Sequence, residues 1–163
     1  MAGFKIRIAG DWSKFDNALT RLTRVSFTTL HKLLGEEVLS QISKRFREGV
    51  DPKGRLWEKS YRARLKGGQT LRDTAKLQRS FTVRADADSA AIGTNDIRAR
   101  IHQFGGVIRP KRAKRLTFKL ADGRFVSVKK VKMPARAMVG FNEHNKRALA
   151  DVINDYLQEQ IER

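Results

Sequence analysis

The 163-residue chain contains no cysteine, which excludes disulfide bonds, thiolate zinc sites and cysteine nucleophiles. Its apolar runs are only a few residues long, too short for a helix that spans a membrane. The opening MAGFKIRIAG also lacks the apolar stretch and cleavage site of a secretory signal. We therefore expect no membrane partner, and the lack of cysteine suits a reducing cytoplasm.

Residue patterns that carry catalysis are also missing. The three histidines, His31, His102 and His144, are scattered and have no metal-ligand spacing. The glycine pair in Gly67-Gly68-Gln69-Thr70 lacks the lysine and the spacing of a phosphate-binding loop, and there is no nucleophile elbow. The sequence thus predicts no catalytic residues, no metal site, no cofactor and no small-molecule substrate. We expect a protein that is not an enzyme.

Acidic residues are few: 17 Asp and Glu against 35 Lys and Arg give a formal net charge of +18 and a pI near 11.0. The excess is concentrated in residues 98–136, which hold 13 Lys and Arg and one acid, Asp122. Residues 137–163, by contrast, carry 3 basic and 5 acidic side chains. Such a concentrated positive charge favours a polyanion or an acidic protein surface as partner, and charge alone does not decide between them.

Hydrophobic periodicity predicts both helices and strands. Helical spacing is expected over residues 13–24, 28–48, 70–80 and 97–104, and in a C-terminal helix with an apolar stripe from Leu149 to Ile161. Gly49 is expected to end the long helix. Strands are expected over residues 3–8, 81–86 and 90–93, and a hairpin over residues 116–120 and 124–128.

The stretch between the long helix and residue 70 is expected to be irregular. Asp51-Pro52-Lys53-Gly54 forms a turn, and a polar loop that carries Trp57 and Tyr61 follows it. No linker or repeat divides the chain. We predict a single α+β domain over residues 1–163, with helices packed on a small antiparallel sheet and one protruding basic β-hairpin.

Three stretches follow one another in the middle of the chain. The first is Arg45-Phe46, the turn at residues 51–54, and Trp57. The second runs from Leu71 to Phe81 and holds a Leu-x-x-Thr-x-x-Leu-x-x-Ser pattern. The third is Ile101-His102-Gln103-Phe104-Gly105-Gly106, followed by Met133-Pro134-Ala135-Arg136 and Val139-Gly140. In this order, over roughly residues 40–141, they resemble the Mu-like phage virion morphogenesis family, also described as tail completion proteins.

The resemblance implies a virion protein added at the head-proximal end of the tail, in the neck where tail and head join. It implies no catalysis and no cofactor, and its partners would be other neck and tail proteins. We expect a ring-shaped homo-oligomer assembled in the host cytoplasm, and consider DNA passing through its lumen as a further partner. Ala75 stands where the family usually has glycine, so we expect the helix to continue through this position.

Two local patterns have a structural and a functional interpretation. Trp57 and Tyr61 lie among basic residues, as in an aromatic surface for nucleic acid. We favour Trp57 as a structural anchor that fixes its loop to the core or to a neighbouring subunit, because a large ring contributes much apolar burial. Similarly, we expect His102-Gln103 to cap backbone groups at a helix end rather than to form a binding site.

The basic residues beside the predicted hairpin are the candidate contact site for nucleic acid or an acidic partner: Arg109, Lys111, Arg112, Lys114, Arg115, Lys129, Lys130 and Lys132. Closing the hairpin brings both basic runs to its base. They are suited to phosphate contact without base readout, or to an acidic protein. The alternative to the virion adaptor is therefore a free nucleic-acid-binding protein that acts through this hairpin without sequence specificity.

Overall fold

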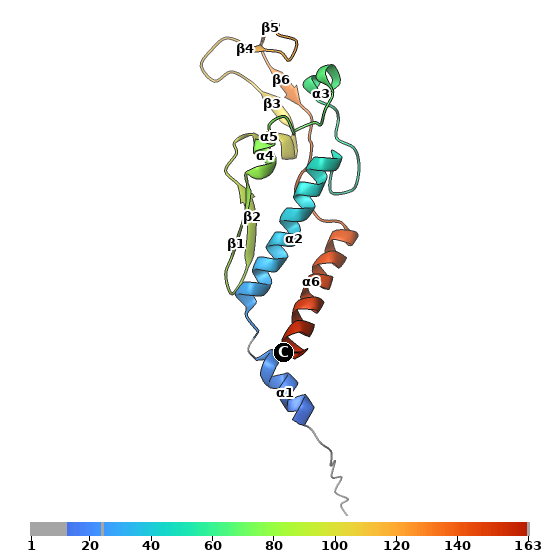
Figure 1. The fold of residues 1–163 in the computed structure, drawn as a ribbon. Helices are drawn as coiled ribbons and strands as arrows, with labels where there is room; N and C mark the ends of the chain where they lie inside the picture. Colours follow the sequence, from blue (N-terminus) through green and yellow to red (C-terminus); the bar gives the residue numbers. More distant parts are fainter. Residues whose placement is uncertain (1–12, 24, 163) are drawn as a thin grey trace, which may run out of the picture.

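The computed structural model describes residues 13–23 and 25–162 (Figure 1). The strand predicted over residues 3–8 lies outside the described residues. The helices are α1 (Ser13–Leu22), α2 (Phe27–Glu48), α3 (Tyr61–Lys66), α4 (Lys76–Arg79), α5 (Arg98–Phe104) and α6 (Glu143–Glu162). The strands are β1 (Phe81–Ala85), β2 (Ala90–Thr94), β3 (Gly106–Ile108), β4 (Leu116–Lys119), β5 (Phe125–Val128) and β6 (Val131–Met133).

Helix α2 is the central element, and its ends are set by local sequence. Ser26 precedes it, and the Ser26 hydroxyl accepts a hydrogen bond from the Thr29 amide at 3.3 Å. Gly49 ends it in the left-handed conformation, with φ of 72°, and its amide donates to the Arg45 carbonyl. The predicted end of the long helix at Gly49 is confirmed.

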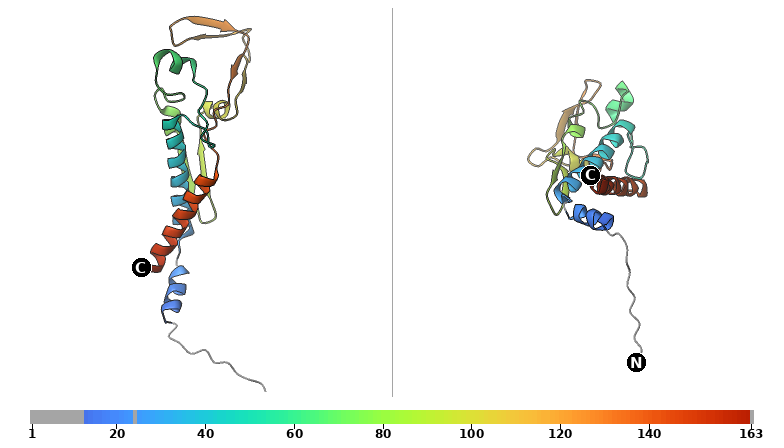
Figure 2. Two further views of the ribbon diagram at one scale, coloured as in Figure 1. Left: turned by 90° about the vertical axis from the view of Figure 1, so that its right-hand side faces the viewer. Right: turned by 60° about the horizontal axis from the view of Figure 1, so that its bottom comes forward.

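Two elements cover opposite sides of α2 (Figures 1 and 2). The β1–β2 hairpin lies along one side and α6 along the other. Gly35 allows the close approach of β1, because a Cβ atom there would collide with the Val83 side chain. In α6, Leu149 packs against the core and Tyr156 is buried, so the predicted apolar stripe faces the protein except at its end, where Ile161 is 38% exposed.

The strands form three separate two-stranded antiparallel sheets, β1–β2, β3–β6 and β4–β5. The predicted α+β class with a small antiparallel sheet is confirmed, and the hairpin predicted over residues 116–120 and 124–128 is present as β4–β5. The two strands predicted over residues 81–86 and 90–93 are also present, and they pair with each other as β1–β2. The β3–β6 pair, in register from Gly106 opposite Met133, was not predicted. Each of its strands has three residues, too few to show a two-residue alternation.

Two predicted segments differ from the structure. The loop after Trp57 contains α3, which begins where the Ser60 hydroxyl accepts a hydrogen bond from the Ala63 amide at 3.2 Å. The helix expected over residues 70–80 is confined to α4, because Leu71 and Ala75 both adopt positive φ, 63° and 55°. The expected continuous helix at Ala75 is therefore wrong: the backbone keeps a conformation that glycine adopts most readily.

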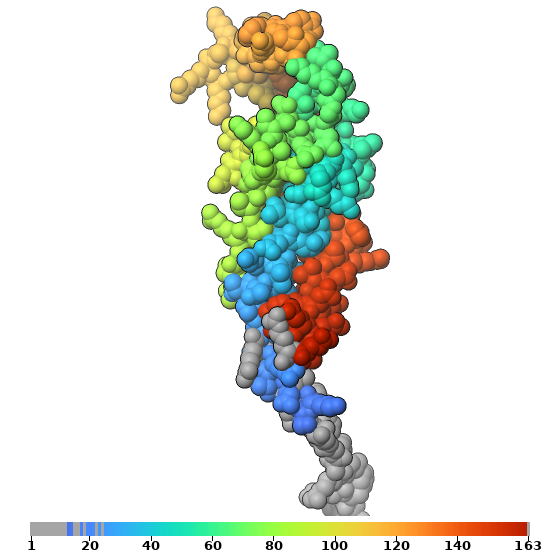
Figure 3. Space-filling model, in the orientation of Figure 1, coloured from blue at the N-terminus to red at the C-terminus, as the bar shows by residue number. Residues whose placement is uncertain are grey.

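The core lies near the C-terminal end of α2. Its buried side chains come from α2, the following loop, α4, β1 and the segment before α6: Val38, Ile42, Phe46, Trp57, Leu77, Phe81 and Met138. Each such side chain contributes about 1.5–3 kcal/mol through burial. The molecule is elongated, with α1 at one end and the β4–β5 hairpin at the other (Figure 3). Among the described residues, no helix has the length and apolar character needed to cross a membrane.

Candidate functional site

The motif residues meet at one backbone segment, residues 136–139. The Gln103 side-chain oxygen accepts hydrogen bonds from the Met138 and Val139 amides at 2.8 and 3.0 Å, and its nitrogen donates to the Val139 carbonyl at 2.8 Å. Trp57 Nε1 donates to the Ala137 carbonyl at 3.1 Å. Gln103 satisfies backbone groups, as expected, but these groups lie 35 and 36 residues further along the chain rather than at its own helix end.

Arg45 ties the same segment to both long helices. Its Nη1 donates to the Met138 carbonyl at 2.9 Å and its Nη2 to Asn145 Oδ1 at 2.8 Å, across the interface between α2 and α6. Burial lowers the pKa of the Arg45 guanidinium, while the nearby Asp51 carboxylate opposes that change. A buried charge of this kind is tolerated because its donors have partners, and removing those partners is costly.

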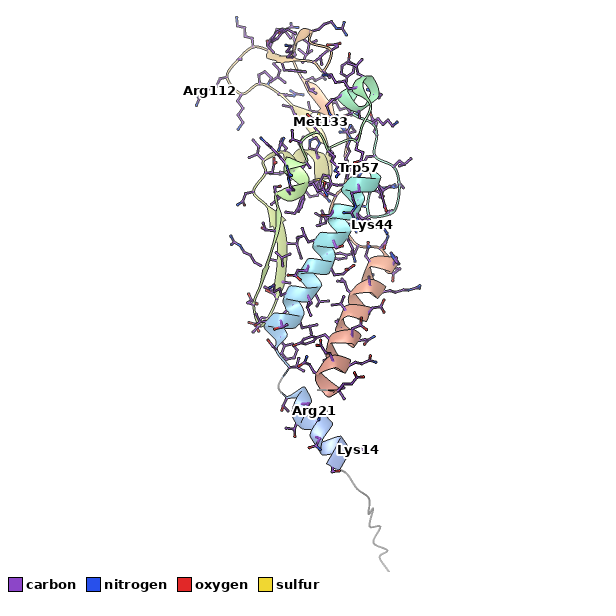
Figure 4. All side chains as sticks on the ribbon, in the orientation of Figure 1. Lys14, Arg21, Lys44, Trp57, Arg112 and Met133 are labelled. Carbon is purple, nitrogen blue, oxygen red and sulfur yellow. The ribbon has the colours of Figure 1, made fainter. Side chains whose placement is uncertain are left out.

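Trp57 lies inside the core, with 6% of its surface exposed. Its ring packs edge-on against Phe46, with the centroids 5.5 Å apart, beside the end of α2 (Figure 4). A ring in this position is not accessible for stacking on a base, so Trp57 cannot belong to an aromatic nucleic-acid surface. Its contribution to stability as an anchor stays a prediction.

The basic arm, residues 106–133, extends from this junction to the end of the molecule (Figure 1). Its root is the β3–β6 pair and its tip is the β4–β5 hairpin, with Leu116 opposite Val128. The predicted cationic side chains lie in the loop between β3 and β4, in the loop between β5 and β6, and on β6, and all are exposed. Arg112 points away from the arm into solvent (Figure 4).

The eight predicted cations have few polar contacts within the protein. Arg115 donates to the Ser127 carbonyl at 2.6 Å, a contact across the β4–β5 pair. None of the eight predicted residues forms an ion pair with a carboxylate of the described residues. The structure therefore brings the two groups of basic residues together at the open end of the β4–β5 hairpin, toward the β3–β6 pair. No carboxylate of the described residues forms an ion pair with them.

The arm is attached to α3 through its tip. The Tyr61 hydroxyl donates to Asp122 Oδ2 at 2.7 Å, and Arg124 Nη2 pairs with the same carboxylate oxygen at 2.8 Å. The hydrogen bond from Tyr61, together with those from Arg124, holds the pKa of Asp122 well below its usual range. The Asp122 carboxylate therefore stays ionised near pH 7. We call the contact between Tyr61 and Asp122 the latch. The sequence gives no local sign of it, because 61 residues separate Tyr61 from Asp122.

In residues 13–23 and 25–162, no three His, Asp or Glu side chains gather into a set that could hold a metal ion. His102 is half-buried, and desolvation lowers its pKa, with the Arg136 and Arg98 charges adding to the effect. The lowered pKa favours the neutral form of the ring.

Comparison with known sequences tests the resemblance that the motif residues carry. The sequence model of the phage virion morphogenesis family matches residues 10–158. The chain belongs to the phage virion morphogenesis family. This membership confirms the resemblance carried by the three stretches. It also gives the protein a role in virion assembly.

A named relative gives the same result. The chain is 28% identical over 144 residues to Mu-like prophage FluMu G protein 2 of Haemophilus influenzae. That similarity covers 87% of this chain and 88% of the relative, so the two align over nearly their whole lengths. No solved structure shows a significant match to this chain.

Proposed function

We propose that this protein completes the head-proximal end of a phage tail and forms part of the neck, where it joins tail to head as a structural component rather than an enzyme. The observation that carries the proposal is the family match over residues 10–158. The junction described above supports it. Gln103, Trp57 and Arg45 all use their polar groups to hold one backbone segment, which is a structural use of side chains and not a catalytic one.

The proposal includes assembly into a homo-oligomeric ring. A net charge of +18 opposes self-association through the basic surfaces, so we look for contacts between copies on exposed apolar area. Helix α5 offers such area. Ile97 and Phe104 are 92% and 75% exposed, and their seven-residue spacing places them on one side of the helix, beside a groove of about 370 Å³. We infer that a second copy covers this side of α5.

Replacing both Ile97 and Phe104 by serine is expected to reduce the assembled species at a given concentration by at least about tenfold, because each interface would be deprived of two apolar side chains that contribute about 1 kcal/mol or more apiece. Sedimentation velocity of the full chain measures this. Leu56→Ser is the control, since Leu56 is 81% exposed in the loop between α2 and α3, away from α5. Unchanged assembly in the double variant would remove α5 from the ring contact.

Deleting the gene tests the function directly. We expect lysates to contain filled heads and separate tails that fail to join stably, with joined virions restored by supplying the protein from a plasmid. Electron microscopy of the lysates provides the measurement. Normal joined virions in the deletion would refute the neck assignment. That result would favour the second candidate, a free nucleic-acid-binding protein, which the unpaired cations of the basic arm support.

A further inference from the structure

Helix α3 shares an end of the molecule with the basic arm. The latch from Tyr61 to Asp122 joins the start of α3 to the tip of the hairpin, and Arg124 Nη2 also lies 3.5 Å from the Tyr61 hydroxyl. Figure 1 shows α3 beside the β4–β5 hairpin at this end. Three further exposed cations, Lys59, Arg64 and Lys66, come from α3 and the residues before it. The positive surface is therefore larger than the hairpin.

We call this surface the basic end and define it by eleven exposed side chains: Lys59, Arg64, Lys66, Arg109, Lys111, Arg112, Lys114, Lys119, Lys129, Lys130 and Lys132. None of the eleven forms an ion pair with a carboxylate of the described residues. The one acid of the arm, Asp122, already pairs with Arg124. The basic end thus presents a concentrated positive charge that favours binding of a polyanion or an acidic surface.

We propose that the basic end, made of α3 and the arm together, binds DNA through its phosphates without reading base sequence. The inference rests on the proposed function, because a neck component is positioned where DNA passes between head and tail. Neither part is built for base readout. Helix α3 has six residues, and the arm consists of short strands and loops rather than a recognition helix.

The choice of residues favours DNA over an acidic protein. Eight of the eleven cations are lysines. Lysine is depleted at the buried centre of protein interfaces, because its strongly hydrated ammonium group is expensive to desolvate. A phosphate backbone accepts such groups in a wet interface, and binding releases the counterions condensed on the DNA.

The test compares three variants of the full chain, each lacking three positive charges. The α3 variant carries Lys59→Gln, Arg64→Gln and Lys66→Gln, and the arm variant carries Lys111→Gln, Arg112→Gln and Lys114→Gln. The control carries Lys32→Gln, Lys44→Gln and Lys146→Gln, at exposed lysines that already pair with Glu36, Glu48 and Glu143. All nine residues are exposed, so we expect the three variants to melt as the unmodified protein does.

The measurement is the affinity for a random-sequence DNA duplex of about 30 base pairs, followed against salt from roughly 50 to 200 mM. A plot of log affinity against log salt has a negative slope, and its magnitude decreases by about 0.9 for each phosphate that the protein no longer neutralises. We therefore expect the α3 variant and the arm variant each to flatten the slope by about two to three units. The control should change it by less than about one unit, as a net-charge effect alone.

Two outcomes would overturn the inference. If the α3 variant behaves as the control does, α3 is not part of a DNA surface. If the unmodified protein shows no salt-dependent DNA binding but binds polyglutamate, and the arm variant loses that binding, the basic end faces an acidic protein. The second outcome leaves the proposed function intact. Failure of the proposed function appears separately, as normal joined virions in the gene deletion.

Discussion

Trp57→Ala is expected to lower the free energy of unfolding by about 3–5 kcal/mol, the usual cost of removing a large aromatic ring from a packed core. The indole is 6% exposed and lies against Phe46, in the cluster that also contains Met138. Its Nε1 hydrogen bond to the Ala137 carbonyl is lost as well, which leaves that carbonyl without this donor. Urea unfolding followed by circular dichroism measures the change.

Trp57→Phe separates the two contributions. It keeps an aromatic ring in the core but removes the indole nitrogen, so we expect a loss of about 1–3 kcal/mol, smaller than that of Trp57→Ala. The anchor interpretation would be wrong if Trp57→Ala left melting and assembly unchanged while DNA affinity fell. In that case the ring would act at a binding surface, contrary to its burial.

Much of the secondary structure could be predicted because its signals are local. The end of α2 depends on Gly49 and its immediate neighbours, and the β4–β5 hairpin depends on the turn residues Asp122 and Gly123 between two short apolar stretches. The turn at residues 51–54 is likewise local: Asp51 accepts backbone hydrogen bonds from Lys53 and Arg55. Such elements are specified by a few adjacent residues.

The missed elements depend on tertiary contacts. The β3–β6 pair exists because Gly106 and Met133 meet across the whole arm, and its strands are too short to be recognised separately. The interruption before α4 requires Ala75 in a conformation that its own sequence does not favour. Tertiary packing imposes it: Leu71 packs against the core before the interruption and Leu77 lies within the core after it.

The candidate site could be predicted only where its residues are recognisable from local sequence. The eight cations of the arm could be identified from charge alone, and their exposure agrees with the predicted position beside a hairpin. The basic residues around Tyr61 could also be recognised in the sequence, but the position of α3 beside the arm could not, because it depends on the contact between Tyr61 and Asp122. Gln103 could be predicted to bind backbone groups, but not that these groups belong to the segment that Trp57 and Arg45 also hold.

Gly105→Ala is expected to lower the free energy of unfolding by about 2–6 kcal/mol, because two costs add at the root of the arm. Gly105 has φ of 69° and ψ of −171°, a region nearly restricted to glycine, where alanine costs about 1–3 kcal/mol. An added Cβ atom would also lie 2.8 Å from the Ala135 amide nitrogen, and forcing the backbone apart costs about 1–3 kcal/mol more.

Gly67→Ala is the control, since Gly67 has φ of 73° and ψ of −169° with nothing within 4 Å of the added atom. Thermal or urea unfolding should show Gly105→Ala less stable than Gly67→Ala by about 1–3 kcal/mol. Equal losses in the two variants would mean that the segment after β6 moves away from α5 at little cost, and that the arm is not rigidly fixed to the junction.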